Sequence, residues 1–245
     1  MFSFWQKKNK EHFDYSLLGA DMHSHLIPGI DDGSPDIETS LVLIKGMVDA
    51  GYKKLITTPH ILWDMYQNTR EDILLKFEVL KEKIKEEGLE VELGVGAEYY
   101  LDDYVKELLK KKEPLLTITK NLVLVEFSLA SEPIDLTDIL FELQVQGYQP
   151  VIAHPERYIY NERNKYFFEV LKSSGLLFQL NILSLSGFYG KAVQEMANYF
   201  LKNEFYELAG TDLHNQHHLE ALANPVLNAS LKKLVDSGKL INADL

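Results

Sequence analysis

Histidines and carboxylates stand in short motifs that are spread along the whole sequence. His23 and His25 are separated by one residue in Asp-Met-His-Ser-His, and Asp31 and Asp32 follow in Asp-Asp-Gly. Residues two apart on a strand turn their side chains to the same face, so both histidines point the same way. The other candidates are His60 in Thr-Thr-Pro-His, Glu98 in Gly-Ala-Glu, Glu126 in Leu-Val-Glu-Phe, His154 in Ala-His-Pro-Glu-Arg, and Asp212 and His214 in Gly-Thr-Asp-Leu-His.

The chemistry of these side chains favours a metal cluster. A single histidine or glutamate beside a strand is more often a polar partner or a loop residue than a ligand. Glu98 and Glu126, however, each end an apolar run, and an isolated buried carboxylate needs a cation or strong hydrogen bonds. Mixed imidazole and carboxylate ligands suit Zn, Mn or Fe better than Ca or Mg alone. Eight or nine ligands are too many for one ion, so two or three metals with bridging carboxylates are expected.

Such a cluster is suited to the hydrolysis of phosphoesters. It binds phosphate oxygens, stabilises the charge that develops on them and lowers the pKa of a bridging water to give hydroxide. The sequence has no cysteine, which excludes thiolate metal sites and a cysteine nucleophile, so hydroxide is the expected nucleophile. Arg157, three residues after His154, could clamp a phosphate bidentately. The alternative for this residue is a surface arginine paired with Glu156 or Glu162.

The elements that must position these residues alternate along the chain from about residue 20. Strands are predicted at 20–26, 54–58, 91–97, 122–127, 150–153, 177–182 and 206–209. Two helices are predicted to begin near Ser34-Pro35 and near Thr69, and to end at Gly51 and Gly88. Further helices are predicted at 103–111, 136–146, 165–173 and 191–202, with a helical tail from residue 219.

Seven β-then-α units of this kind predict parallel strands joined by crossover helices, closed like a barrel. In a β/α barrel the carboxyl ends of the strands share one face, where active sites lie. Six of the seven predicted strands deliver a candidate ligand there, and the sixth offers Asn181 as a hydrogen bonder. With 245 residues, 46% of them hydrophobic, the chain is expected to form a single α/β domain over residues 20–245, preceded by a tail over residues 1–19.

Charge and hydropathy narrow the possible partners. The formal net charge is -12, and no basic stripe offsets it, so a nucleic-acid substrate is disfavoured. No apolar run approaches the roughly 20 residues of a membrane span. The first residues carry neither the apolar core nor the cleavage site of a signal peptide. A cytoplasmic protein is therefore expected.

Seven motifs, taken together and in order, resemble the PHP (polymerase and histidinol phosphatase) family. More narrowly, they look like the bacterial PHP-type tyrosine-protein phosphatases of capsule and exopolysaccharide operons. The resemblance covers nearly the whole chain from about residue 20. The motifs are Asp21-Met-His-Ser-His25, Asp31-Asp32-Gly33, Thr58-Pro59-His60, Gly96-Ala97-Glu98, Glu126-Phe127-Ser128, His154-Pro155-Glu156-Arg157-Tyr158 and Thr211-Asp212-Leu213-His214-Asn215.

The resemblance implies a distorted (β/α)7 TIM-like barrel, the PHP fold, holding three metals. The metal is usually Mn²⁺, with Fe, Zn or Mg as alternatives. It implies that Arg157 binds the substrate phosphate, and that the substrate is phosphotyrosine on a membrane-associated tyrosine autokinase that regulates polysaccharide export. The implied ligand sets are His23, His25, Glu98 and Asp212 for one metal, Glu98, Glu126 and His154 for a second, and Asp32, His60 and His214 for the third.

One stretch departs from the pattern of the family. Relatives carry a further arginine shortly after the last histidine motif, whereas residues 215–219 read Asn-Gln-His-His-Leu. His217 or His218 could take the place of that arginine, and Asp31 and Asn181 are weaker candidates for contact with the substrate. Otherwise the phosphate is held by Arg157 and the metals alone.

Three other functions remain open on the sequence. A small-molecule phosphatase, such as a histidinol-phosphate phosphatase, would share the metals and differ in the pocket. A non-catalytic PHP binding module would have broken ligand sets, but every ligand is present here. A PHP nuclease is disfavoured by the acidity of the chain.

Overall fold

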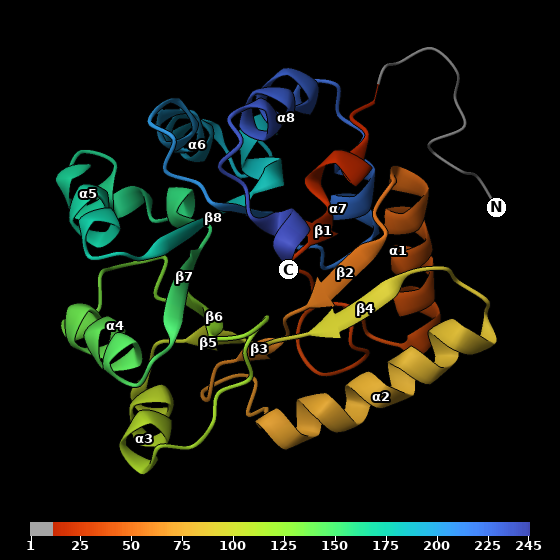
Figure 1. Cartoon of the computed structure of the whole chain (residues 1–245), viewed down its shortest axis with the longest axis horizontal. Helices are drawn as coiled ribbons and strands as arrows, with labels where there is room; N and C mark the ends of the chain where they lie inside the picture. Colours follow the sequence, from red (N-terminus) through yellow and green to blue (C-terminus); the bar gives the residue numbers. More distant parts are fainter. Residues whose placement is uncertain (1–11) are drawn as a thin grey trace.

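Parallel strands form the centre of the molecule, and helices surround them (Figure 1). The computed structural model describes residues 12–245. Its strands are β1 (Ala20–Asp21), β2 (Lys54–Thr57), β3 (His60–Ile61), β4 (Glu92–Val95), β5 (Glu98–Tyr100), β6 (Leu122–Glu126), β7 (Gln149–Ala153), β8 (Leu177–Asn181) and β9 (Leu208–Gly210). They form a three-stranded sheet of order β1-β2-β4 and a six-stranded sheet of order β3-β5-β6-β7-β8-β9. Every strand pairing is parallel, as the sequence predicts.

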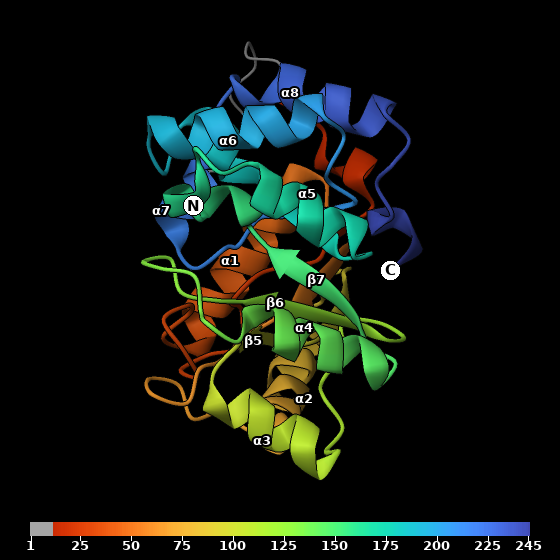
Figure 2. The same ribbon diagram turned by 90° about the vertical axis from the view of Figure 1, so that its left-hand side faces the viewer.

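The helices follow the strands in the alternation that was predicted. The α-helices are α1 (Ile37–Ala50), α2 (Arg70–Glu86), α3 (Asp103–Lys111), α4 (Leu136–Val145), α5 (Tyr166–Ser173), α6 (Lys191–Lys202), α7 (Gln216–Ala221) and α8 (Leu227–Asp236). Short 3-10 helices are η2 (Tyr15–Leu18), η3 (Pro155–Arg157), η4 (Ile159–Asn161), η5 (Ile182–Ser186) and η6 (Asn242–Asp244). Figure 2 shows α6 and α8 beside each other at one end of the molecule, with α2 and α3 at the other.

The cap residues explain where the first two helices begin. Asp36, not the predicted Ser34, caps α1, because its carboxylate accepts a hydrogen bond from the backbone N–H of Thr39. The end of α1 at Gly51 is confirmed, since this glycine adopts a left-handed conformation with φ 118°. The start of α2 is also confirmed, because Thr69 and Asp72 form a capping box.

Two predicted strands are each followed, after a break, by a second short strand. The run 54–58 forms β2, which ends at Thr57, and β3 begins at His60 beyond Pro59. The run 91–97 forms β4, which ends at Val95, and β5 begins at Glu98. Hydrogen bonds bridge both breaks, from Gly96 N to Thr57 O at 2.9 Å and from Glu98 N to Pro59 O at 3.0 Å. The three-stranded and six-stranded sheets are thus continuous with each other here. His60 and Glu98 lie on these resumed strands, whereas the sequence placed them at the ends of single longer ones.

The first and last strands also approach each other. The predicted strand 20–26 is wrong in length, since β1 comprises two residues. Beyond it, Ser24 makes an isolated parallel bridge to Leu213. The backbone N–H of Asp212 donates to His23 O at 2.7 Å, and His25 N donates to Leu213 O at 2.9 Å. The two ends of the curled sheet are therefore joined at the segments that carry the first and last histidine motifs.

Residues before β1 are packed against the rest of the chain. Phe13, Tyr15 and Leu18 are buried, and the hydroxyl of Tyr15 donates to the carbonyl of Leu222 at 2.8 Å. Residues 1–11 of the predicted tail lie outside the described part of the chain. The packed structure thus begins several residues before the boundary that was expected at residue 20.

Apolar side chains form two clusters. The larger one packs the helices against the strands. The smaller one includes Met22, directly after β1, and one residue from each of four strands: Ile56 of β2, Leu124 of β6, Val151 of β7 and Leu208 of β9. Strands of a curled sheet turn alternate residues to its inside, so this second cluster fills the space between the strands. Within residues 12–245, no helix is long and apolar enough to span a membrane.

Gly210 allows β9 to approach the first strand. A Cβ added at this residue would lie 2.6 Å from His23 Cβ and 3.1 Å from the His23 backbone nitrogen. We therefore expect Gly210→Ala to lower the free energy of unfolding by about 1–3 kcal/mol, because the backbone must shift to relieve the clash. Urea denaturation checks this. Gly94→Ala is the control, since its Cβ would meet the side chain of Ile56 at 3.2 Å. Equal effects of both substitutions would contradict the close approach.

Candidate metal centre

Ligand atoms from distant motifs converge into three groups whose members lie within 4.8 Å of one another. Two of the groups share Glu98, two share His25 and two share His60. This arrangement requires side chains from the first histidine motif, β3, β5, β6 and the segment after β9. The groups are His23, His25, Glu98 and Asp212; His60, Glu98 and Glu126; and His25, Asp32, His60 and His214.

The first group is the same set that the sequence motifs implied. The Nε2 atoms of His23 and His25 lie 3.3 Å apart. His23 Nε2 is 3.1 Å from Glu98 Oε2 and 3.3 Å from Asp212 Oδ1, and the corresponding distances from His25 are 3.4 and 3.3 Å. Ligand atoms about 2.0–2.1 Å from a tetrahedral ion lie about 3.3–3.4 Å from one another. These four atoms therefore have the spacing of ligands around a single ion.

The second group differs from the expected one. Its third member is His60, whose Nδ1 lies 3.2 Å from Glu98 and 3.1 Å from Glu126. The expected His154 stands close by, with Nε2 3.2 Å from Glu98 Oε1 and 3.8 Å from Glu126 Oε2. The two carboxylates are thus flanked by one imidazole on each side.

The third group contains the expected Asp32, His60 and His214, with His25 in addition. The carboxylate of Asp32 lies 3.5 Å from Nε2 of both His60 and His214. The Asp32 side chain is 53% exposed, whereas those of His23 and Glu98 are fully buried. The cluster is therefore closed on the side of the first group and open to solvent beside Asp32.

Buried groups with unmet bonding capacity fit the presence of metal ions. Among the described residues, the buried Nδ1 atom of His60 has two carboxylates within 3.2 Å but no hydrogen bond of good geometry. Burial raises the pKa of Glu98, yet the adjacent His23 and His60 outweigh this and hold its pKa well below the ordinary value. An ionised carboxylate is thus kept in a buried place, which is the state that a bound cation requires.

Hydrogen-bond partners at Nδ1 fix the orientation of three histidine rings. His23 Nδ1 lies 3.0 Å from Gln179 Oε1, His25 Nδ1 lies 2.8 Å from Asp31 Oδ2, and His214 Nδ1 lies 2.9 Å from the carbonyl of Asp212. An acceptor at Nδ1 places the ring proton there and leaves Nε2 as a metal ligand. The tautomers of these rings are therefore set by the protein.

Asp31 has a different environment from the one expected of a substrate contact. Its carboxylate, buried completely, binds His25 and accepts hydrogen bonds from the backbone N–H groups of Gly33 at 3.0 Å and His60 at 3.1 Å. Burial lowers the pKa of His25, but Asp31, acting together with Asp212 and Glu98, raises it well above the ordinary value. Asp31 is thus placed as an orienting partner of the cluster, and its contact with a substrate stays a prediction.

Arg157 reaches the cluster from the side of Asp212. Its Nη1 donates to Asp212 Oδ2 at 3.1 Å, and its side chain is 24% exposed. Burial lowers the pKa of this arginine, but Asp212, Tyr189 and the nearby glutamates together raise it above its ordinary value, so the guanidinium stays charged. The alternative pairings are wrong, because Glu162 pairs with Arg163 and buried Glu156 accepts from Asn181 N, Ser184 Oγ and Tyr206 Oη.

Asn181, His217 and His218 lie on the same side of the site. Asn181 Nδ2 donates to Asp212 Oδ2 at 3.0 Å, so this side chain orients a carboxylate of the cluster. His218, on α7, has Nδ1 3.1 Å from the carbonyl of Asp212, and burial lowers its pKa. His217 is exposed and packs against Phe188 at a ring separation of 5.1 Å.

Three residues around the cluster have no place in the sequence motifs. Gln179, a polar residue within the apolar β8, could have been noticed as a buried polar group. Tyr66 stacks on the ring of His60 at 5.6 Å, and Tyr189 lies under the guanidinium of Arg157 at 4.8 Å. Nothing in the sequence distinguishes these two tyrosines from the others, because their contacts are made across the fold.

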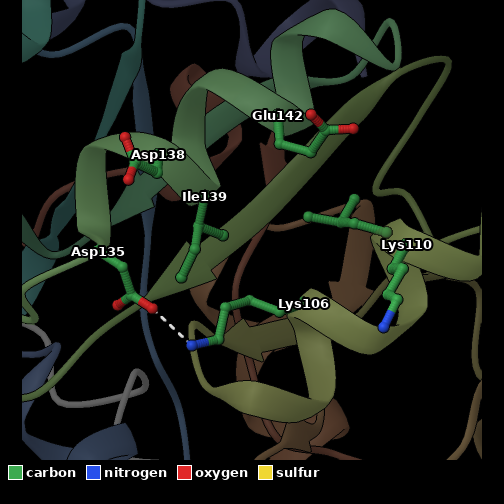
Figure 3. Close-up of a pocket in the computed structure, with 7 residues that line it drawn as sticks. Lys106, Lys110, Asp135, Asp138, Ile139 and Glu142 are labelled. Atoms are coloured by element: carbon green, nitrogen blue, oxygen red, sulfur yellow. Dashed lines mark hydrogen bonds and ion pairs between the residues drawn. The ribbon is translucent and has the colours of Figure 1, made fainter.

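A cavity of about 370 Å³ lies apart from the cluster, between α3 and α4 (Figure 3). Lys106 and Lys110 line one side, and Asp135, Asp138 and Glu142 line the other. Lys106 forms an ion pair with Asp135 across it. The cavity contains none of the candidate ligands.

Comparison with known proteins agrees with the sequence motifs. The chain is 32% identical over 202 residues to the tyrosine-protein phosphatase CpsB of Streptococcus agalactiae, covering 80% of this chain and 82% of CpsB. It is 27% identical over 195 residues to the tyrosine-protein phosphatase YwqE of Bacillus subtilis, covering 80% and 77%.

The fold and the family are shown by two further matches. A chain from the crystal structures of YwqE from B. subtilis and CpsB from Streptococcus pneumoniae, described as unique metal-dependent tyrosine phosphatases, superposes with a TM-score of 0.78. The two share 25% identity, and the match covers 92% of this chain and 90% of that chain. The family described as "Capsular polysaccharide synthesis, CpsB/CapC" matches residues 19–236. The chain belongs to the CpsB/CapC family of capsular polysaccharide synthesis.

Proposed function

We propose that this protein is a metal-dependent tyrosine-protein phosphatase, which hydrolyses the phosphoric monoester of phosphotyrosine. The observation that carries the proposal is the buried group of His23, His25, Glu98 and Asp212 with Arg157 bound to its edge. The relatives that bear the name tyrosine-protein phosphatase support the same activity. The site thus combines ligands for cations with a separate charged group that can bind a phosphate.

The proposed metal ligands are the nine residues in the three ligand sets that the sequence motifs implied. His25 and His60 each belong to two of the groups in the structure. Bound metals would neutralise the phosphate and supply an activated water as nucleophile. Asp212 Oδ1 faces His23 and His25, and its Oδ2 accepts from Arg157. Arg157 therefore stands beside the ligand set, where its remaining N–H groups can bind phosphate oxygens and the charge that develops on them.

The leaving group places a small demand on the protein. Tyrosine has a pKa of about 10, so tyrosinate departs more easily than an alkoxide, and a strong general acid is not needed. The open side of the cluster beside Asp32, exposed at 53%, gives a protein-bound phosphotyrosine a way in. His217 and His218, on the side of Phe188 and Asp212, remain proposed substrate contacts.

The remaining expectations extend this proposal. We propose Mn²⁺ in a three-metal cluster, and a phosphotyrosine protein such as a membrane-associated tyrosine autokinase as the cytoplasmic partner. We also propose that the curled sheet is a distorted (β/α)7 barrel, in which β2 with β3 and β4 with β5 count as one strand each, and that residues 20–245 form the catalytic domain. The parallel bridge from Ser24 to Leu213 supports closure of this barrel.

The choice of substrate is tested by direct comparison. We expect the Mn²⁺-loaded protein to hydrolyse a phosphotyrosine peptide with a higher kcat/KM than histidinol phosphate. A preference for histidinol phosphate would reverse the assignment to a small-molecule phosphatase. A purified protein that holds no metal and cannot be reconstituted would instead identify a non-catalytic module.

Arg157→Ala removes the proposed phosphate-binding charge. We expect kcat/KM for a phosphotyrosine peptide to fall by about a hundredfold to a thousandfold, because a donor aimed at the developing charge is lost. The metal content should stay the same, since Arg157 is not a ligand. Arg163→Ala is the control, because this arginine is 95% exposed and pairs with Glu162. Steady-state kinetics with metal analysis decide the matter, and equal rates for both variants would refute the role of Arg157.

Asp31→Ala tests the orienting role of the buried carboxylate. Loss of the partner at His25 Nδ1 should weaken Mn²⁺ binding by about tenfold to a hundredfold. This range is typical when the hydrogen-bond partner of a metal-binding histidine is removed. Isothermal titration calorimetry measures the affinity. Asp64→Ala, at an exposed loop position, should bind Mn²⁺ like the wild type. Unchanged affinity in Asp31→Ala would show that His25 needs no such support.

A further inference from the structure

We propose that Tyr189 is a positioning residue that holds the guanidinium of Arg157 in the orientation in which it binds phosphate. The inference rests on the proposed function, in which Arg157 binds the substrate phosphate. Tyr189 belongs to none of the three ligand groups. Its place in the site follows from contacts with Arg157, Asn181 and the turn that carries it.

The ring of Tyr189 lies under the charged end of Arg157. The guanidinium carbon of Arg157 is 4.8 Å from the centre of the ring. A cation within about 6 Å of an aromatic face is attracted by the partial negative charge on that face, and the attraction is stronger where water is excluded. The ring is half-buried, and burial raises the pKa of its hydroxyl, which keeps the phenol neutral. Tyr189 therefore supplies a flat apolar support without adding a competing charge.

The hydroxyl of Tyr189 is tied to the same carboxylate that binds Arg157. Asn181 Nδ2 donates to Tyr189 Oη at 3.1 Å and to Asp212 Oδ2 at 3.0 Å. An amide NH₂ group has two hydrogens, so it can make both bonds at once. Arg157 Nη1 donates to the same Oδ2 at 3.1 Å. The four side chains thus form a closed ring of contacts.

The backbone around Tyr189 is itself well defined. Tyr189 lies in the turn from Gly187 to Gly190, whose ends have φ values of 80° and 95°. The N–H of Gly190 donates to Gly187 O at 2.9 Å and closes the turn. Phe188 packs edge-on against Tyr189 at 5.0 Å and against His218 at 5.2 Å. The ring of Tyr189 is thus held from the side of α7 as well as from Asn181.

Such support matters because Arg157 stands among several carboxylates. Within residues 12–245, its guanidinium makes one hydrogen bond, which uses a single N–H, and the fork has five. Glu126 and Glu98 also attract it. Without the ring below, the guanidinium could rotate to pair with these carboxylates. The contact with Tyr189 leaves the other N–H groups available for phosphate.

The test measures the binding of inorganic phosphate to the Mn²⁺-loaded protein by calorimetry. We expect Tyr189→Leu to raise the Kd for phosphate by about three- to tenfold, the range of a partly buried cation–aromatic contact. Tyr189→Phe keeps the ring and should stay within about twofold of the wild type. In the Arg157→Ala background, Tyr189→Leu should weaken phosphate binding no further, because the group that it positions is gone.

Tyr199→Leu is the matched control. It removes a ring on α6 whose centre lies 4.0 Å from Lys165 Nζ, and should leave phosphate binding unchanged. If Tyr189→Leu unfolds at a lower temperature than the wild type, Tyr189→Met is used instead. Methionine fills more of the same space and has no aromatic face. Mn²⁺ affinity should be unchanged in every Tyr189 variant.

The outcomes separate this inference from the proposed function. An unchanged Kd in Tyr189→Leu, or an equal loss with and without Arg157, would overturn the positioning role. Phosphate binding is measured without turnover. A wild-type protein that binds phosphate but does not hydrolyse phosphotyrosine would therefore refute the proposed function. A loss of affinity in Tyr189→Leu that appears only when Arg157 is present would still support the role of Tyr189.

Discussion

The structure depends on one buried carboxylate, that of Glu98. Its oxygens lie 3.1–3.4 Å from the rings of His23, His25, His60 and His154. Removing an ionised group from water costs several kcal/mol unless it is paired and hydrogen-bonded. The fold must therefore bring partners to it from the first histidine motif, β3 and the end of β7. A metal ion is the partner that would satisfy Glu98 and the surrounding rings together, which ties folding of the centre to its chemistry.

Interruptions in the strands are what bring these partners together. Breaks at Pro59 and after Val95 let β3 and β5 continue at a new angle, so His60 pairs directly with Glu98 in the ladder. His154 and Asp212 adopt left-handed backbone conformations, with φ 35° and 51°, which cost energy for residues with a side chain. Each follows directly on a strand or within two residues of one. Strain at these points turns a ligand that would otherwise continue along the sheet towards the common centre.

The sequence was sufficient for the order of elements and for most of the ligand set, because hydrophobic periodicity, caps and local motifs are short-range signals. The capping box at Thr69 and the stop at Gly51 are examples. It was insufficient where the outcome depends on partners far along the chain. Examples are His60, which joins His154 beside Glu98 and Glu126, the orienting role of Asp31, and the contacts of Tyr189. All of them arise from distances between elements that no local pattern encodes.

Asp212 links the two halves of the proposed chemistry. One carboxylate oxygen faces His23 and His25, and the other accepts hydrogen bonds from Arg157 and Asn181. A cation on the first side would withdraw charge from the carboxylate and weaken the hold on Arg157. The arginine would then be freer to bind a phosphate oxygen, while the ring of Tyr189 still fixes its plane. Metal loading and phosphate binding would thus be coupled through a single side chain.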